Sequence, residues 1–545
     1  MRRKFLKVAV AATAIALFAS GCSGGDGDGE GTATEKSGGE LRVYDSEPAF
    51  LLPSAADDEP SIYVIRQLYR GLVKYNAETG APENDLAESV ESTDQKLWTI
   101  KIKSGYTFEN GEPVNADAFI RAWNFAAYSP NAQANAYFMG RIAGIDDVSS
   151  TDPDDDGPKP APEPKAKELS GLKKVDDLTF TVELSEPFSG FPAQIGYSGF
   201  FPMAQACVDD HEACNEKPIG NGPYKIEGTW EHNVGITLTR SDTFAGDKGK
   251  PDKILYRLYA EIDAAYAAFQ AGELDVVYAI PPARYKEAKS TFGDRMYERP
   301  SDSFTYIGLP LYKNEFKDKK IRQALSLSID RQGIIDAVFD GRFSPATGFV
   351  SSGFEGYREG VCKYCTQDVA KAKQLLQEAG GWKGGKLQLW ANAGAGHEQW
   401  LQAVGDQIKA ALGIDYELKV NLQFPEYLAT GDAKKFTGPF RLGWGPDYPY
   451  IESYLQPLYG SEAGNNSSGY SNPEVDKFIT EGDSAATMSD GIASYQKAED
   501  IVGEELPVIP MWFGKVAAVY SDNVETFVWN AISDADYGQM TMKQP

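Results

Sequence analysis

Alternation of apolar and polar residues predicts short strands in the N-terminal half of the chain. Residues 97–103 read L-W-T-I-K-I-K, and residues 178–184 read L-T-F-T-V-E-L. Successive side chains of a strand point to opposite faces, so each segment is expected to bury one face and expose the other. Further strands are predicted at residues 40–44, 237–240 and 254–259.

Apolar residues three or four positions apart predict helices. In residues 60–71, Ile62, Ile65 and Tyr69 share one face, and Gly71 is expected to end the helix. Asn115 is a plausible N-cap for a second helix. Other helices are predicted at residues 264–270, 320–331, 368–379, 397–411 and 495–505, and strands at residues 386–390, 440–444 and 506–513. Helices that alternate with short strands indicate an α/β lobe in the second half.

The predicted strand at residues 440–444 leads into an unusual turn. Gly445 and Pro446 interrupt the strand, because Gly tolerates unusual backbone angles and Pro donates no N–H. Asp447 follows among aromatic residues that include Trp444 and Tyr448. A carboxylate among large rings is costly to bury unless a cation meets it. The alternative is an Asp that caps a turn among core aromatics.

The first residues have the pattern of a signal peptide. A basic segment, residues 1–7, precedes an apolar run at residues 8–18 that is too short to span a bilayer. The small residues before Cys22 resemble a bacterial lipobox, which implies cleavage after residues 1–21 and attachment of diacylglycerol and palmitate to Cys22. The alternative is an ordinary signal peptide with a chance Cys. Residues 22–37 are Gly-rich and polar, so they are predicted to form a flexible tether.

Composition narrows the choice of partners. The 545 residues carry a net charge of −26, and removal of the four basic residues in the signal peptide brings the charge to about −30. Such a charge repels nucleic acid and anionic lipid surfaces. At 42% hydrophobic residues the chain can bury substantial cores, and its length suggests several domains. These properties are typical of a soluble protein in an exposed compartment.

Four cysteines of the mature chain form two close pairs in the sequence. Cys207 precedes Cys214, and Cys362 precedes Cys365. An exported protein meets an oxidising compartment, so we expect a disulfide within each pair. The alternative is one four-cysteine zinc site, for which the two pairs would have to converge.

An acidic segment has the spacing of a calcium-binding loop. Asp152, Asp154, Asp156 and Glu163 fit the pattern D-x-D-x-D-G-x5-E, in which hard carboxylates wrap Ca²⁺. Lys159 stands where an apolar residue is usual, and neighbouring prolines oppose a following helix. The alternative is a solvated, Pro-rich surface loop that binds no metal. No cofactor is otherwise expected.

Catalytic motifs give little support for an enzyme. The three histidines form no H-E-x-x-H, and the chain contains no G-x-S-x-G, P-loop or G-x-G-x-x-G. Ser170-Gly-Leu-Lys173 and Ser521-Asp-Asn523 are similar to motifs of penicillin-interacting serine enzymes, but no Lys-Thr-Gly follows. Chance accounts for two such short motifs in a chain of this length. We therefore expect a protein that is not an enzyme.

Several motifs together resemble one family. Trp444-Gly-Pro-Asp447-Tyr, followed by Ser453-Tyr-Leu, resembles the ligand-facing loop of bacterial oligopeptide-binding proteins. These are extracytoplasmic solute-binding proteins of ABC importers. Further family-like strings lie at residues 97–117, 140–146, 219–224, 271–275 and 320–331, so the resemblance covers about residues 40–545. The chain is thus identified as similar to the oligopeptide/dipeptide-binding cluster (family 5 extracellular solute-binding proteins), in lipoprotein form.

The resemblance implies an α/β, two-lobed periplasmic-binding-protein-like fold (class II, cluster C) with an extra subdomain on lobe I. Lobe I is expected to comprise residues 38–71, 188–260 and 507–545, and the subdomain residues 72–187. Lobe II would span residues 261–506. A peptide would lie between the lobes, which would close by a hinge motion.

The same resemblance implies a peptide site. Asp447 would receive the α-ammonium of the peptide, and backbone groups around Gly443 and Gly445 would pair with the peptide as an added strand. Arg441 would orient Asp447 or pair with the peptide carboxylate. Other implied ligand-side residues are Trp444, Tyr448, Tyr137, Glu59 and Trp512. Pro446 departs from the family pattern, because it stiffens the loop and removes one backbone donor.

The implied function is capture of oligopeptides and their delivery to an ABC-importer permease. The protein would be a monomer on the outer face of the cell membrane, which it would touch only through its lipid anchor. Since the same cluster includes binders of nickel complexes, sugars and haem, a non-peptide ligand is an alternative. A penicillin-interacting serine enzyme is the alternative from another class.

Overall fold

The computed structural model describes residues 38–151, 161–530 and 535–543. The predicted signal peptide, the tether and Cys22 lie outside these ranges. In the described ranges, no helix is long and apolar enough to cross a membrane.

One large sheet carries the fold. Within the described residues it has eleven strands, in which β13 (Ser344–Pro345) pairs with β17 beside the main path. The order along that path is β15 (Tyr416–Leu422), β14 (Leu387–Asn392), β16 (Phe440–Trp444), β12 (Met296–Gly308), β17 (Val508–Tyr520), β11 (Val276–Val277), β1 (Glu40–Asp45), β10 (Lys253–Leu258), β9 (Gly235–Arg240) and β8 (Tyr224–Ile226). Both long strands, β12 and β17, lie in the middle of this order.

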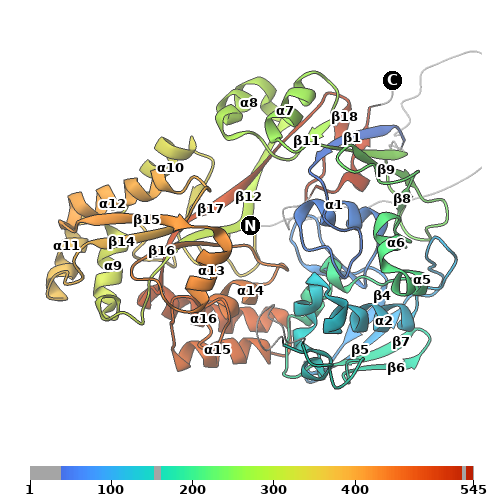
Figure 1. Ribbon diagram of the computed structural model, residues 1–545, viewed down its shortest axis with the longest axis horizontal. Coiled ribbons are helices and arrows are strands. Elements are labelled where there is room, and N and C mark those ends of the chain that lie inside the picture. Colours follow the sequence, from blue (N-terminus) through green and yellow to red (C-terminus); the bar gives the residue numbers. More distant parts are fainter. Residues whose placement is uncertain (1–37, 152–160, 531–534, 544–545) are drawn as a thin grey trace, which may run out of the picture. The chain divides into compact units, whose positions relative to one another are not determined.

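Strands β12 and β17 connect the two ends of the sheet. They pair antiparallel and run side by side in Figure 1, and their register shifts between Pro300 and Phe304. On one side β17 pairs with β11, which pairs with β1; on the other side β12 pairs with β16. Strand β17 is longer than the strand predicted at residues 506–513, because it keeps pairing with β12 as far as Val519 and ends at Tyr520.

A separate sheet is built from the alternating segments. Its order is β4 (Ala87–Glu91), β5 (Leu97–Ile102), β7 (Thr179–Glu183) and β6 (Leu172–Asp176). Trp98, Ile100 and Phe180 are buried, while their sequence neighbours are more exposed, so the predicted one-sided burial is confirmed. Two small hairpins complete the β-structure: β2 (Val73–Tyr75) with β3 (Pro82–Asn84), and β18 (Val524–Thr526) with β19 (Thr541–Met542).

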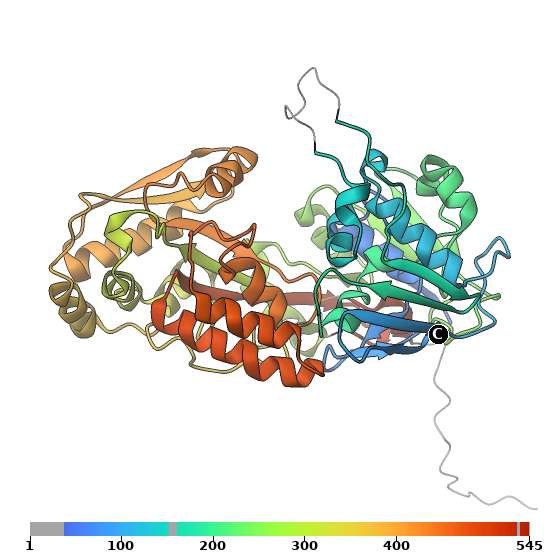
Figure 2. The same cartoon turned by 90° about the horizontal axis from the view of Figure 1, so that it is seen from below.

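The helices follow their predicted starting signals. Asn115 Oδ1 accepts from Ala118 N at 3.2 Å, which confirms the N-cap. The helices before β12 are α1 (Glu59–Leu68), α2 (Ala116–Ala127), α3 (Ile145–Val148), α4 (Phe191–Gln194), α5 (Gln205–Asp209), α6 (His211–Glu216), α7 (Ile262–Gln270) and α8 (Tyr285–Phe292). Those after β12 are α9 (Lys319–Leu327), α10 (Arg331–Phe339), α11 (Val369–Glu378), α12 (Glu398–Leu412), α13 (Phe424–Asp432), α14 (Glu452–Tyr459), α15 (Pro473–Asp483) and α16 (Met488–Glu505). Helices α15 and α16 pack side by side, as the orange-red pair in Figures 1 and 2 shows.

The largest hydrophobic cluster joins distant parts of the chain. It combines side chains of the four-stranded sheet and α2 with side chains of α14, α15 and α16. Phe188, Tyr448 and Tyr450 lie in it, with the ring centroid of Phe188 6.3 Å from that of Tyr448. This cluster fixes the surroundings of the turn that contains Asp447.

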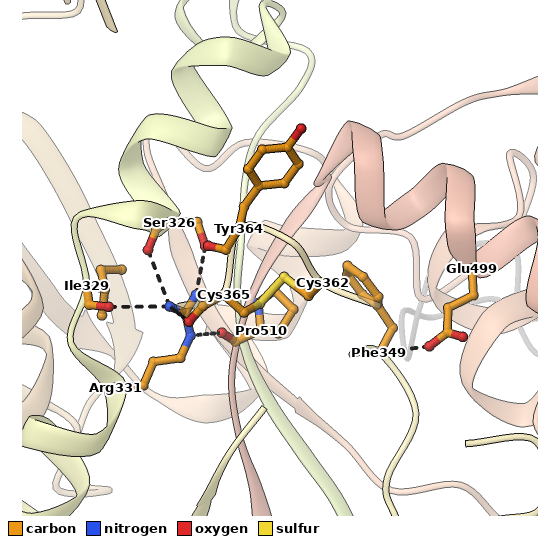
Figure 3. The surroundings of a disulfide bond; sticks show 9 residues. All are labelled: Ser326, Ile329, Arg331, Phe349, Cys362, Tyr364, Cys365, Glu499 and Pro510. Carbon is orange, nitrogen blue, oxygen red and sulfur yellow. Dashed lines mark hydrogen bonds between the residues drawn. A yellow bond between two sulfur atoms is a disulfide. The ribbon is translucent and has the colours of Figure 1, made fainter. Parts of the chain in front are cut away.

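The family-like string at residues 320–331 holds a buried arginine. Arg331 is 3% exposed, and Figure 3 shows its guanidinium among backbone carbonyls. Its Nε donates to Pro510 O at 2.6 Å, and its Nη1 donates to Cys365 O at 2.6 Å. Its Nη2 donates to Ser326 Oγ at 2.7 Å. Burial lowers the pKa of Arg331 to about 9. The string therefore ties α9 and the Cys365 turn to β17.

Candidate functional site

The turn with Asp447 connects β16 to α14. Strand β16 spans Phe440–Trp444, the predicted range, and Gly443 lies opposite Thr305 of β12. Trp444 Nε1 donates to Ser453 O at 2.7 Å, which closes the turn at its base. Tyr448 OH donates to Glu452 Oε2 at 2.6 Å within the turn. These contacts hold Asp447 at a fixed place between two secondary-structure elements.

Asp447 is half-buried, and Tyr137 OH lies close enough to its carboxylate to favour the ionised form. In the described part of the chain, no Lys, Arg or His forms an ion pair with it, and no backbone N–H donates to its carboxylate. Burial raises the pKa of Asp447 to about 6; the nearby hydroxyl of Tyr137 opposes the shift, and the charge of Glu452 adds to it. In the described residues Asp447 therefore caps no backbone N–H, as the turn-capping alternative would require. Its carboxylate is free to meet a cation.

Tyr137 comes from the 3₁₀ helix η2 (Ala134–Arg141), far from Asp447 in sequence. Its side chain is 59% exposed, and its ring centroid lies 4.0 Å from that of Phe138. Phe138 in turn lies 4.1 Å from Tyr197. The structure thus brings two of the predicted ligand-side residues, Tyr137 and Asp447, into direct contact at an exposed edge of the aromatic cluster.

Arg441 offers a positive charge on the same strand. Its Nε is buried without a hydrogen-bond partner, and within the described ranges it forms no ion pair. Burial lowers the pKa of Arg441, and the nearby hydroxyls of Tyr427 and Tyr306 oppose that shift. A Cβ at Gly443 would lie 3.3 Å from Arg441 Nη2, so Gly443 leaves room for the guanidinium. Arg441 makes no hydrogen bond to Asp447 in the described residues.

His397 was not identified from the sequence as a site residue. It precedes α12, and Trp400 Nε1 donates to its Nδ1 at 3.2 Å. Burial lowers the pKa of His397 to about 4, and the charge of Arg441 adds to the shift. The imidazole is therefore neutral at physiological pH and lies close to Arg441. A lone histidine before a helix carries no sequence signal for this placement.

Strand β16 has an unpaired edge beside these residues. In the described residues, β14 pairs with β16 only at Trp390↔Phe440. In the described ranges, β16 pairs from Arg441 to Trp444 with β12 on one side and with no strand on the other, where Arg441 O accepts from Tyr427 OH at 2.8 Å. Gly443 and Gly445 are exposed, and nothing lies within 4 Å of a Cβ built on Gly445. An extended chain therefore has access to the backbone of this strand.

Three predicted ligand-side residues have other surroundings. Trp512 is 2% exposed, with its ring 4.9 Å from that of Trp400, so it belongs to a hydrophobic core. Tyr448 is buried and its hydroxyl is bound to Glu452. Glu59 is exposed at the start of α1 and accepts from Tyr63 OH at 2.8 Å. Large apolar rings bury readily, which accounts for the placement of Trp512 and Tyr448.

The cysteines lie in two separate pairs at disulfide bonding distance. The sulfur atoms of Cys207 and Cys214 are 2.04 Å apart, and those of Cys362 and Cys365 are 2.07 Å apart. Cys207 and Cys214 lie on the neighbouring short helices α5 and α6. In the described ranges, no group of three or more His, Cys, Asp or Glu is placed to hold a metal ion.

Reduction of the two pairs is expected to destabilise the protein. A disulfide that closes the short loop between Cys207 and Cys214 should stabilise the folded protein by about 2–3 kcal/mol, because it restricts the unfolded chain. Peptide mapping without reductant should yield both linked pairs, and a Cys207→Ser/Cys214→Ser chain should unfold at lower urea than wild type. Free thiols or bound zinc in the native protein would contradict the pairing.

The calcium prediction lies mostly outside the described residues. Asp152, Asp154 and Asp156 belong to the undescribed range, and Glu163 is exposed. Calcium binding there stays a prediction.

The second motif of the enzyme alternative has a structural role: Ser521 Oγ and Asn523 Nδ2 both donate to Asp275 Oδ1, at 2.9 and 3.2 Å.

Comparison with known proteins gives consistent matches. Residues 81–466 match the family described as "Bacterial extracellular solute-binding proteins, family 5 Middle". The oligopeptide-binding protein OppA of Bacillus subtilis is 29% identical over 500 residues, with 88% of each chain covered. The periplasmic murein peptide-binding protein MppA of Escherichia coli is 27% identical over 481 residues, with 87% of each chain covered.

Solved structures match nearly the whole chain. The unliganded open form of the murein tripeptide-binding protein MppA has a TM-score of 0.80 at 24% identity and covers 94% of this chain and 98% of its own. HbpA2 from Haemophilus parasuis has a TM-score of 0.80 at 20% identity, with 93% and 100% covered. At these identities the likeness shows the fold, which is the predicted two-lobed α/β fold.

Proposed function

We propose that this chain, which belongs to the bacterial extracellular solute-binding proteins of family 5, captures oligopeptides and delivers them to an ABC-importer permease. The family and the peptide-binding names of its relatives support the general class of ligand.

The observation that carries the proposal is the carboxylate of Asp447 with no cationic partner among the described residues. A half-buried carboxylate is costly unless a cation meets it. The α-ammonium of a peptide supplies one charge and three N–H donors at the end of an extended chain. Tyr137 OH, which lies near Asp447, would remain beside that ammonium as a neighbouring polar group.

The other groups of the site fit the rest of a peptide. The edge of β16 from Leu442 to Trp444, beyond the Arg441 carbonyl that Tyr427 OH occupies, offers backbone groups to an added strand. The unpaired guanidinium of Arg441, with neutral His397 nearby, suits the peptide carboxylate. Contacts to the main chain and to the two ends of the peptide do not depend on its side chains. Low selectivity for peptide sequence is therefore expected.

Peptides of unusual linkage are the second candidate. Relatives of similar identity are named for murein peptide and for glutathione, at 27% and 25% identity. Such ligands keep a free ammonium and a free carboxylate, so Asp447 and Arg441 would serve them equally. A sugar, haem or nickel complex has no α-ammonium to pair with Asp447 and is disfavoured on that ground. The relatives are solute-binding proteins, which supports a protein without catalytic activity.

Titration calorimetry with trialanine and N-acetyl-trialanine tests the proposal. Wild type should bind the free peptide, and acetylation should remove most of the affinity because it removes the ammonium charge. Mass spectrometry of the natively purified protein should find a co-purified peptide. Equal binding of both probes would contradict the role of Asp447 and, with it, the peptide proposal.

The larger architecture belongs to the proposal as well. Lobe I would comprise residues 38–71, 188–260 and 507–545, the subdomain residues 72–187, and lobe II residues 261–506. Strands β12 and β17, with the register shift after Pro300, would serve as the hinge between the lobes. The protein would act as a monomer tethered outside the cell membrane.

Substitution of the lipid-bearing cysteine is expected to free the protein. If Cys22 carries diacylglycerol, Cys22→Ala should move the protein from the membrane fraction to the soluble extracytoplasmic fraction, because the charged mature chain has no other apolar anchor in its sequence. Cell fractionation with immunodetection measures this, and Cys22→Ala protein that stays with the membrane would contradict the anchor.

A further inference from the structure

A second, buried contact joins the same two segments that carry Tyr137 and Asp447. Arg141 ends η2, and Glu452 begins α14. Arg141 Nη2 lies 2.6 Å from Glu452 Oε1, across 311 residues of sequence. The segment with Tyr137 and the turn with Asp447 are therefore tied together twice, once at the exposed edge and once inside.

Both oxygens of the Glu452 carboxylate are held. Oε1 meets Arg141, and Oε2 accepts from Tyr448 OH at 2.6 Å. The Glu452 side chain is 1% exposed, whereas that of Arg141 is 29% exposed. The Arg141 guanidinium lies 4.0 Å above the ring of Phe188, which packs against Tyr448. Tyr448 directly follows Asp447, so its hydrogen bond to Glu452 links that carboxylate to the turn that carries Asp447.

The pair also controls the charge around Asp447. The negative charge of Glu452 raises the pKa of Asp447. Arg141 lies directly on Glu452 and offsets that charge. Without Arg141, an ionised Glu452 would oppose ionisation of Asp447 more strongly, because like charges in a low-dielectric site disfavour each other.

We propose that Arg141 and Glu452 are a positioning pair that holds Asp447 beside Tyr137 and keeps it charged for the cationic end of a ligand. This inference rests on the proposed function, since it assigns the pair to the site that would bind the peptide ammonium. Arg141 and Glu452 are not themselves expected to touch the ligand.

Other charged and titratable groups face this region from several elements. Burial raises the pKa of Asp483 to about 7; the charge of Glu452 adds to that shift, and Arg141 opposes it. Tyr495 OH donates to Asp483 at 2.6 Å. The groups around Asp447 and the pair are Tyr137, Arg141, Tyr448, Tyr450, Glu452, Asp483, Tyr495, Tyr197, Tyr75, Asp57, Asp58 and Arg66.

The proposed role of Arg141 and Glu452 predicts the direction in which each substitution shifts the pH dependence of ligand affinity. An ammonium binds the ionised form of Asp447, so wild-type affinity for trialanine should approach its maximum at about pH 7, be half of it at about pH 6 and fall further at lower pH. Arg141→Gln should move this fall to higher pH by roughly one unit, and Glu452→Gln should move it to lower pH by a similar amount. At pH 6, Arg141→Gln should then bind trialanine roughly fivefold more weakly than wild type.

Matched controls separate this role from general damage. Arg358 and Glu499 form a similar pair at 2.9 Å, with side chains 30% and 1% exposed, and they do not affect the pKa of Asp447. Arg358→Gln should lower the stability of the protein without moving the pH profile. Arg141→Lys should keep the wild-type profile because it keeps the charge, and Arg141→Gln/Glu452→Gln should return towards it.

Calorimetric titration of these chains with trialanine between pH 5 and 8 is the decisive experiment. Opposite shifts of the pH profile for Arg141→Gln and Glu452→Gln, with the profile of Arg358→Gln unchanged, would establish the positioning role of Arg141 and Glu452. Shifts in the same direction, unchanged profiles, or an equal shift in Arg358→Gln would overturn it, even if wild type binds the peptide.

A measurement without ligand decides the case in which trialanine does not bind. For each chain, the pH dependence of stability is compared with that of its Asp447→Asn counterpart. A carboxyl group whose pKa is higher in the folded than in the unfolded protein makes the protein less stable as the pH rises above the unfolded pKa. This decrease in stability ends when the pH reaches the folded pKa. That end point should lie higher in Arg141→Gln and lower in Glu452→Gln than in wild type. An unmoved end point would refute the pair, whereas absent peptide binding alone would refute only the proposed function.

Discussion

Asp447→Ala should weaken the binding of trialanine by about 10² to 10³·⁵-fold. Removing one partner of a buried ion pair costs about 3–5 kcal/mol, because the other charge is left unpaired. At about 1.4 kcal/mol for each tenfold change, this cost gives the stated range. Titration calorimetry at pH 7.5, where Asp447 with its pKa of about 6 is ionised, measures the effect.

Acetylation of the peptide shows whether the contact is direct. Wild type should bind N-acetyl-trialanine more weakly than trialanine by a similar factor, whereas acetylation should weaken binding to Asp447→Ala little further. The effects of the two changes on affinity should therefore be strongly non-additive. Asp432→Ala is a suitable control, because Asp432 is an exposed acid on α13. If Asp447→Ala and acetylation add independently, Asp447 does not meet the ammonium, and its effect on affinity is indirect.

Arg331→Met should destabilise the protein by about 2–6 kcal/mol. The substitution keeps an apolar stem but removes the donors to Pro510 O and Cys365 O, both 2.6 Å from the guanidinium (Figure 3). Each buried carbonyl left without a donor costs about 1–3 kcal/mol. Calorimetric unfolding should therefore show a melting temperature several degrees lower.

Two variants keep this prediction falsifiable. Gln332→Met changes the next residue on α10, which is exposed, and should alter stability by no more than about 0.5 kcal/mol. Arg331→Lys should recover little, because an ammonium cannot reproduce the planar fork of donors that reaches both carbonyls. A melting temperature of Arg331→Met equal to that of wild type would show that β17 and the Cys365 turn hold together without this residue.

The amino-acid sequence by itself determined the local elements of this protein. Alternation predicted the strands β5 and β7, Asn115 predicted the start of α2, and residues 440–444 predicted β16 with its end at Trp444. These features depend on neighbouring residues, because strand burial, helix capping and chain breaking act over a few positions. The ordered motifs also identified the family, and Asp447 was found because it follows such a break.

Only the tertiary structure decided what surrounds Asp447. Its contact with Tyr137 and the pair Arg141–Glu452 join residues about 310 positions apart, and no sequence period specifies such a meeting. The same holds for Arg331, whose partner Pro510 is 179 residues away. Trp512 matched a ligand-side position in the family pattern, but packing buries it at 2% exposure. Which aromatic ring lines a surface and which fills a core depends on the neighbours that folding supplies, because burial is a property of the packed layers and not of the residue.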